Sequence, residues 1–166
     1  MTRRSAATLD TSVWVPYLRA KRYARSVDPL IAAGRVWVHA VVLLELYAGT
    51  GSVNDARALD AIREAARSLG QLYQPAEEDF VLAGRILAYH ARRYGAVRPR
   101  DHSHDLLIAI GAARTGSVLL AENRRDMARW AVLLRKRAEG ASRRPRDVMP
   151  RTGPFAPLRS LSRNRL

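Results

Sequence analysis

Apolar residues follow two different periods along this chain, and the change of period separates candidate strands from candidate helices. Short β-branched or aromatic runs predict strands, whereas apolar positions three or four residues apart predict helices. The predicted strands are 6–10, 35–40 and 117–120, with a weaker edge strand at 71–74. The predicted helices are 11–18, 41–48, 54–69, 77–94 and 105–114. Because strands and helices alternate, the pattern predicts an α/β fold.

Two of the predicted helices are apolar on nearly every side. They are 41–48 (VVLLELYA) and 105–114 (DLLIAIGAAR), and such a composition is typical of buried helices. We predict that the second helix begins at Asp105, after a loop over 98–103 (RPRDHS), and ends before Gly116.

Three other segments have a less regular pattern. Asp28-Pro29 predicts a bend before a short helical piece that ends at Gly34. Residues 127–137 are compatible with either a helix or a strand, because their periodicity does not decide. The arginine-rich segment 141–166 has few large apolar residues, so we predict a folded domain over 1–140 followed by a basic, flexible tail.

Four acidic residues stand where the local pattern favours apolar ones. Asp10 ends the first predicted strand, and Glu45 is the only charge in the helix 41–48. Asp105 opens the other apolar helix, and Asp126 follows the last predicted strand. A buried carboxylate is unfavourable unless it is paired, hydrogen-bonded or bound to a metal. Two like charges about 4 Å apart repel by about 4 kcal/mol at an effective dielectric of 20, so a cluster of acids requires a cation.

The cation that best fits such a cluster is Mg²⁺ or Mn²⁺, since both prefer oxygen ligands. Sites in α/β sheets form where strands end and helices begin, so we expect the four acids to converge at the carboxyl edge of one sheet. Each acid also has a simpler interpretation. Asp10 and Asp105 could each cap a helix, and Glu45 could pair with an arginine. Four such acids in a chain of this size favour a shared metal site.

Length and composition limit the classes of protein to which this chain can belong. Its 166 residues, 48% of them hydrophobic, suffice for one folded domain. No apolar run approaches the roughly 18 residues of a membrane span, and Asp10 interrupts the start of the chain before it could form a signal peptide. The absence of cysteine excludes disulfides and thiolate metal sites and fits a cytoplasmic protein. A net charge of +14 favours a polyanionic partner, although the tail supplies part of it.

Four short motifs surround the acids: LDTSVW at 9–14, VVLLELYAG at 41–49, HDLLIAIGAARTG at 104–116 and LLAENRRDM at 119–127. In order and spacing, the set resembles the four motifs of PIN-domain ribonucleases, in particular the VapC toxins of bacterial and archaeal toxin–antitoxin pairs. No single motif is specific, but the set is, and the resemblance covers roughly residues 6–135. It implies a three-layer α/β fold, in which a parallel sheet has helices on both faces.

The resemblance also implies an activity and partners. The four acids would bind Mg²⁺ or Mn²⁺ in an endoribonuclease that uses water as the nucleophile, so that products carry a 5′-phosphate and a 3′-hydroxyl. The target would be single-stranded or looped RNA, because an A-form duplex hides its bases. A VapB-type antitoxin would bind an apolar groove, and the toxin would form a homodimer. Two positions depart from the family pattern: Ala121 replaces a common Thr or Ser, and Met127 replaces a Phe.

Other residues near the motifs are weaker candidates. Ser12 and Asn123 could orient the acids beside them, and Arg124 and Arg125 could contact RNA phosphates. We interpret the four histidines mainly as packed or loop residues, with substrate contact as the alternative for three of them: His39, His102 and His104, while His90 is expected to pack.

Two other classes of function compete with this interpretation. A PIN scaffold with weakened catalysis would bind RNA or a protein partner; Ala121 and the basic tail favour it, while the intact acid set argues against it. A phosphotransferase of the haloacid-dehalogenase type also starts from an Asp at a strand end. That chemistry needs a second acid two residues later, where this chain has Ser12.

Overall fold

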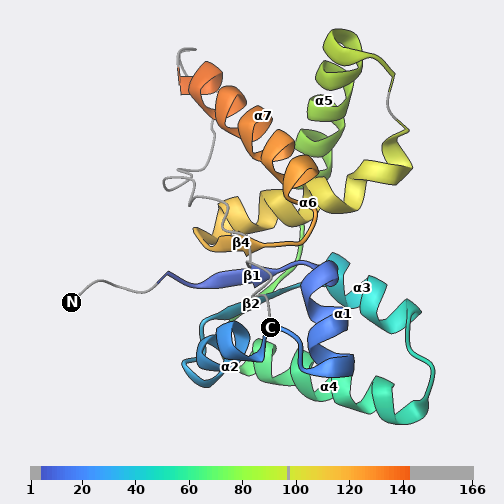
Figure 1. Cartoon of the computed structure of the whole chain (residues 1–166). Helices are drawn as coiled ribbons and strands as arrows, with labels where there is room; N and C mark the ends of the chain where they lie inside the picture. The colour runs from blue at the N-terminus through green and yellow to red at the C-terminus, as the bar shows by residue number, and fades with distance from the viewer. Residues whose placement is uncertain (1–4, 97, 143–166) are drawn as a thin grey trace.

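Short parallel strands form the centre of the molecule, in the order β3-β2-β1-β4 (Figure 1). The structure is a computed structural model that describes residues 5–96 and 98–142. The strands are β1 (Ala7–Leu9), β2 (Val36–His39), β3 (Leu72–Tyr73) and β4 (Val118–Leu120). β1 lies between β2 and β4, and β3 pairs with the outer side of β2. Because every pairing is parallel, the carboxyl ends of the strands meet at one edge of the sheet.

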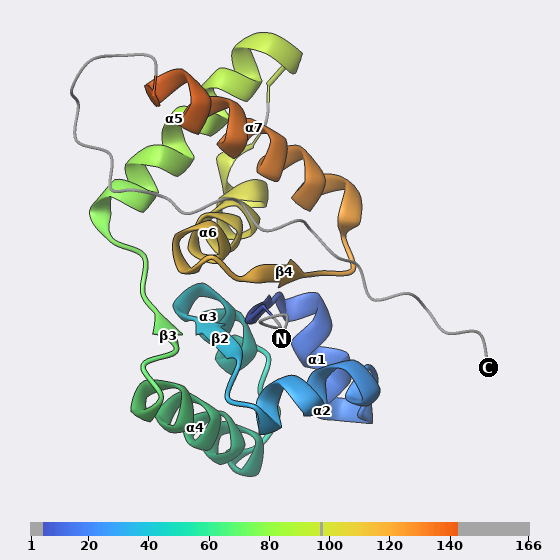
Figure 2. The same ribbon diagram turned by 90° about the vertical axis from the view of Figure 1, so that its left-hand side faces the viewer.

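Helices cover both faces of this sheet (Figures 1 and 2). On one face lie α1 (Thr11–Ala20), α2 (Ala24–Ala32) and α4 (Val53–Ser68). On the other lie α5 (Glu77–Tyr94), α6 (Pro99–Thr115) and α7 (Arg124–Ser142). α3 (Ala40–Ala48) begins directly after β2 and contacts α1, α4 and α6. The predicted three-layer α/β fold is therefore confirmed. None of the helices in 5–96 and 98–142 is both long and apolar enough to cross a membrane.

The helix α6 is the centre of the core, as its apolar sequence predicts. Its residues from Leu106 to Ala112 are all buried, and it contacts β1, β2 and β4. Gly111 allows α6 to approach β2 closely, because a Cβ at this position would lie 2.4 Å from Cδ2 of His39. Any larger residue would force these two elements apart.

The prediction of a loop over 98–103 is wrong, because α6 already begins at Pro99. Proline restricts the residue before it to extended backbone, and Arg98 accordingly has φ −81 and ψ 114 as the N-cap. Proline also fits the first helical position, where its missing N–H has no partner to lose. Asp105 is therefore inside α6, in its second turn, and is not the residue that opens the helix.

Two boundaries in the irregular segments also differ from the predictions. The helix α2 starts at Ala24 and runs through Pro29 without the predicted bend. α7 shows that 127–137 is helical, and it continues past the predicted domain end at 140 to Ser142. The predicted flexible tail lies, from residue 143 onward, outside the described residues.

Candidate active site

Asp10 is held at the carboxyl end of β1, where it caps α1. It is 6% exposed, and its amide donates to the carbonyl of Leu120 at the end of β4 (2.9 Å). Its carboxylate accepts from the amide of Ser12 (3.1 Å) and from the Ser12 hydroxyl. Burial raises the pKa of Asp10, the bonds from Ser12 oppose that rise, and the charge of Glu45 adds to it. Asp10 therefore both caps α1 and experiences the negative charge of a second acid, Glu45.

Glu45 is the only charged residue of α3, a helix in which Val41, Val42, Leu43 and Leu46 are buried. Its side chain is 29% exposed, and each of its oxygens has a partner from another helix. The hydroxyl of Thr11 donates to Oε2, and Nδ1 of His104 lies 2.7 Å from Oε1. Among the described residues, the side chains that bind Glu45 are therefore Thr11 and His104, in place of the arginine of the simpler interpretation.

The pKa of Asp105 is displaced far from the ordinary value of an aspartate. Burial, followed by the charges of Asp10, Glu45 and Asp126, raises its pKa to about 6, and His102 opposes part of that rise. Since Asp105 is inside a helix, capping does not explain its presence. The other three acids thus act on Asp105 through their charge, although each comes from a different element.

Asp126 is the third residue of α7 and belongs to a local set of polar contacts. Its Oδ2 accepts from Nδ2 of Asn123 (2.7 Å), and its Oδ1 lies 2.8 Å from the guanidinium of Arg129. Its amide lies 3.4 Å from Oδ1 of Asn123, as in a helix N-cap. Asp126 is therefore both a helix-terminal residue and a source of negative charge for Asp105.

Ser12 and the loop after β4 connect the first and last motifs. Oγ of Ser12 donates to Asp10 and accepts from the amide of Glu122 (3.0 Å). The Glu122 side chain accepts from the Tyr23 hydroxyl and lies 3.7 Å from the guanidinium of Arg22. Ala121 is buried at this point and offers no hydroxyl, so Ser12 is the side chain that fixes the loop beside Asp10.

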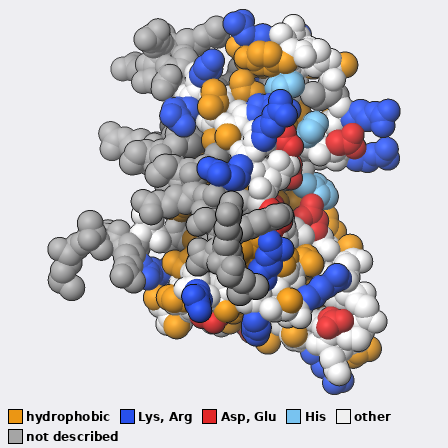
Figure 3. All heavy atoms as spheres, in the orientation of Figure 1, with side chains coloured by type: hydrophobic (Ala, Val, Ile, Leu, Met, Phe, Trp, Pro, Cys, Tyr) orange, Lys and Arg blue, Asp and Glu red, His pale blue; other side chains and the backbone are white. Residues whose placement is uncertain are grey.

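Acidic and histidine side chains gather near the middle of one face, and Lys and Arg side chains flank them on both sides (Figure 3). Arg124 and Arg125 are exposed in the first turn of α7, next to Asp126. Within 5–96 and 98–142, no three His, Asp or Glu side chains are grouped closely enough to hold one metal ion in this conformation. The donors themselves, four carboxylates, match the chemistry that Mg²⁺ and Mn²⁺ prefer.

The sequence of residues 7–133 matches the model of the PIN-domain family. The chain belongs to the PIN-domain family. No curated protein matches it. The matched range contains all four acids and every helix and strand from β1 to most of α7. The expected relationship, which rested on four short motifs, is therefore shown over most of the chain.

Solved structures that are similar to this PIN domain include three complexes bound to DNA. DNA-bound VapBC from Salmonella typhimurium has a TM-score of 0.54 and 24% identity, over 75% of this chain and 91% of that one. FitAB bound to an IR36 DNA fragment has a TM-score of 0.54 and 16% identity, over 75% of this chain and 90% of that one. VapBC2 from Rickettsia felis, bound to a promoter DNA fragment, has a TM-score of 0.53 and 18% identity, over 75% of this chain and 92% of that one. At these identities the likeness shows a shared fold.

The histidines of this PIN domain have different surroundings. His39 is buried, its Nδ1 accepts from the amide of Val41 (3.1 Å), and burial lowers its pKa to about 4. His90 is also buried, and its ring packs on Trp130, as does the ring of His102. The interpretation as packed residues holds for these three.

His104 differs from that interpretation, because it contacts Glu45 across 59 residues of sequence. Thr11 was also missed as a partner of Glu45. Each of them is the immediate neighbour of a candidate acid, since Thr11 follows Asp10 and His104 precedes Asp105. A polar residue beside each acid was the available signal, but the sequence does not specify that both reach α3.

Proposed function

We propose that this PIN domain is the toxin of a VapBC-type toxin–antitoxin pair and acts as an endoribonuclease that depends on Mg²⁺ or Mn²⁺. The observation that carries the proposal is the electrostatic state of Asp105. Burial first, and then the charges of three other acids, raise the pKa of this half-buried carboxylate, so a bound cation or a proton would stabilise it. The family match and the toxin–antitoxin complexes with the same fold support the same conclusion.

The residues that would hold the metal are Asp10, Glu45, Asp105 and Asp126. Each carboxylate has about four lone-pair positions, so the bonds from Thr11 and His104 to Glu45 leave others available for an ion. When bound, the ion would lower the pKa of a water molecule and polarise the scissile phosphate. The protein's own contribution is to keep the acids in place through hydrogen bonds such as that from Ser12 to Asp10.

The substrate that fits this face is single-stranded or looped RNA. Arg124 and Arg125 are exposed beside Asp126, where they can bind backbone phosphates without selecting a sequence. Replacing both by alanine should lower the slope of log affinity against log salt by about 1.4, because each phosphate contact on a single strand contributes about 0.7. An unchanged slope would show that RNA binds elsewhere.

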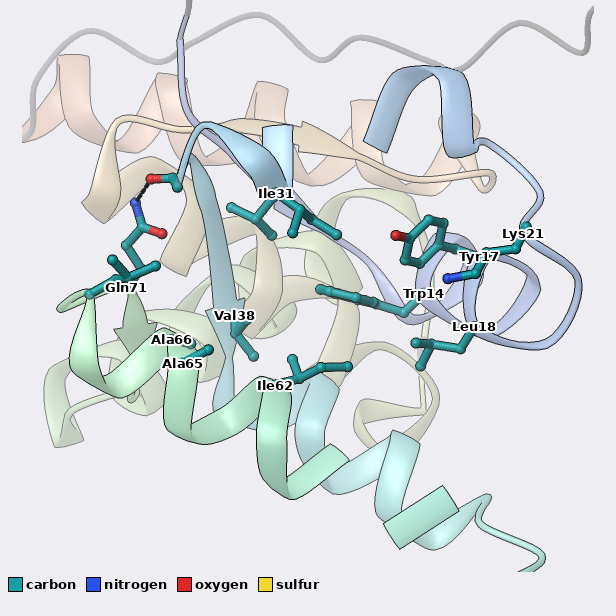
Figure 4. Close-up of a pocket in the computed structure, with 13 residues that line it drawn as sticks. Trp14, Tyr17, Leu18, Lys21, Ile31, Val38, Ile62, Ala65, Ala66 and Gln71 are labelled. Carbon is teal, nitrogen blue, oxygen red and sulfur yellow. Dashed lines mark hydrogen bonds between the residues drawn. The ribbon is translucent and has the colours of Figure 1, made fainter. Parts of the chain in front are cut away.

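The antitoxin fits a groove of about 320 Å³ between α1, α2 and α4 (Figure 4). Its walls are mainly apolar and include Trp14, Tyr17, Leu18, Ile31, Val38, Ile62 and Ala65. Trp14 lies one helical turn after Asp10, so a partner in the groove would adjoin the acids. We infer that an amphipathic segment of a VapB-type antitoxin binds here, with an acidic residue near Lys21 at the rim.

Two substitutions on α4 test the antitoxin site. Ala65→Asp places a charge in the groove and should abolish antitoxin binding in calorimetry, using the antitoxin encoded beside the toxin gene. Ala61→Asp is a matched control, since Ala61 is exposed on the same helix but does not line the groove. Equal antitoxin binding by the two variants would show that the antitoxin binds another surface.

The activity itself is tested by RNA cleavage. Purified protein should cut single-stranded RNA in Mn²⁺ or Mg²⁺, leave duplex RNA intact and be inactive with a chelator. Product ends should be 5′-phosphate and 3′-hydroxyl, and Asp105→Asn should be inactive. Cleavage that persists with the chelator, or 2′,3′-cyclic phosphate products, would refute the mechanism.

A second candidate is a PIN scaffold that binds RNA or a partner without cleaving. Two observations favour it: Ala121 offers no hydroxyl, and both oxygens of Asp126 already have protein partners, Asn123 and Arg129. Calorimetric titration with Mn²⁺ separates the two candidates. Binding that Asp105→Asn removes supports the nuclease, and no binding at millimolar Mn²⁺ supports the scaffold.

A further inference from the structure

Glu45 is held from two sides by residues that are not themselves acids of the site. The α3 residues around it, Val41, Val42, Leu43 and Leu46, are buried and offer the carboxylate no hydrogen bond. A glutamate has three side-chain torsions, so its carboxylate has no fixed direction unless partners supply one. Thr11 and His104 are those partners, and each takes a different oxygen.

The direction of both hydrogen bonds follows from the chemistry of a carboxylate. An ionised carboxylate only accepts, so the Thr11 hydroxyl donates to Oε2 and His104 Nδ1 carries the hydrogen that reaches Oε1 at 2.7 Å. Thr11 is β-branched and stiff about χ1, which suits a fixed donor. The two bonds restrain Glu45 while leaving further lone pairs on both oxygens.

The backbone connections of the two donors couple Glu45 to the other acids. Thr11 directly follows Asp10 at the start of α1, and His104 directly precedes Asp105 in α6. The segments that carry two of the acids therefore also orient the third. Consistent with that closeness, the charge of Glu45 acts on both Asp10 and Asp105.

We propose that His104 and Thr11 are positioning residues, which hold the Glu45 carboxylate in the direction that it would need to bind a divalent cation together with the other acids. This inference rests on the proposed metal-dependent function. In this proposal His104 acts through Glu45: it does not contact RNA and is not a metal ligand. Partners of this kind usually change metal affinity 10–100-fold when they are removed.

The test is Mn²⁺ calorimetry on the full chain without RNA, at one fixed pH. His104→Ala should weaken Mn²⁺ binding about 10–100-fold. His104→Asn should restore most of the affinity, because its side-chain amide can donate from nearly the same position as Nδ1. Thr11→Val, which keeps the shape but loses the donor, should weaken binding, and Thr11→Ser should restore it. Ser103→Ala, at the neighbouring position in α6, is the control and should bind Mn²⁺ like the wild type.

The variants are expected to fold, since the His104 side chain is 45% exposed. Melting temperatures measured without metal check this and separate a structural role, which would lower stability and leave the Mn²⁺ affinity unchanged. Unchanged affinity in His104→Ala and Thr11→Val would overturn the inference while the proposed function stands. Equal loss in His104→Ala and His104→Asn would also overturn it, because the imidazole would then act directly. A wild-type protein that binds no Mn²⁺ would overturn both.

Discussion

Replacing Asp105 by asparagine should stabilise the metal-free protein above pH 6 and leave it almost unchanged near pH 4. Burial and then the charges of three other acids raise the pKa of Asp105 from 3.8 to about 6. The folded state therefore binds this proton more tightly than the unfolded state, so the stability of the wild type falls as the pH rises from about 4 to about 6. Asparagine keeps the size of the side chain but carries no charge at any pH, so it removes this loss.

The size of the effect follows from the displaced pKa. A shift from 3.8 to about 6 corresponds to about 3 kcal/mol if it acts in full. Asp105 is only half-buried, and solvent screens part of the repulsion, so we expect about 1–2 kcal/mol. For a domain of this size, each kcal/mol raises the melting temperature by roughly 2–4 °C.

Scanning calorimetry in the presence of a chelator, at intervals from pH 4 to pH 8, measures this difference. Asp101→Asn is the matched control, because Asp101 is exposed in the first turn of the same helix. That control should lose up to about 1 kcal/mol of helix-dipole stabilisation at neutral pH and should not gain stability. An Asp105→Asn protein that melts below the wild type at pH 7.5, or whose advantage does not change with pH, would refute the electrostatic account of the site.

Two further predictions concern the scaffold, and urea unfolding measures both. Gly111→Ala should destabilise the protein by about 1–3 kcal/mol, because the added Cβ would lie 2.4 Å from the His39 ring; Gly84→Ala, in α5 with open space around it, should be stabilising by up to about 1 kcal/mol. Equal effects at the two glycines would contradict the close contact of α6 with β2. Arg114→Met should cost about 3–5 kcal/mol, because it leaves Asp79, 2% exposed, without its ion-pair partner at 3.0 Å. A cost below about 1 kcal/mol, the usual value for an exposed pair, would show that the neighbouring hydrogen bonds to Asp79 suffice.

Much of this fold could be predicted because its elements have distinct periods. The strands β1, β2 and β4, the apolar helix α3 and the apolar part of α6 all lie where the pattern places them. The pattern predicts wrongly where one residue type suits two structures: Pro99 fits a loop, but proline equally begins a helix, as it does in α6. Pro29 likewise predicts a bend, although α2 accommodates it.

The candidate acids could be named from the sequence because each interrupts an apolar pattern or a strand end. Their partners could not be named in the same way. The contact between His104 and Glu45 joins residues 59 apart, and that between Thr11 and Glu45 joins residues 34 apart. Periodicity identifies which side of a helix is apolar, but it does not specify which neighbouring helix receives a polar residue at the edge of that side. The order of the strands in the sheet also depends on contacts between residues far apart in the sequence, which the periodicity of one segment does not specify.

The central claim is that one divalent cation joins the acids of the four motifs. The most direct measurement is anomalous diffraction at the manganese edge from crystals of the wild-type protein grown in Mn²⁺. We expect a peak with carboxylate oxygens of Asp10, Glu45, Asp105 and Asp126 as ligands, and its loss in crystals of Asp105→Asn. Ordered carboxylates with no peak between them at saturating Mn²⁺, or a peak only at other residues, would contradict it.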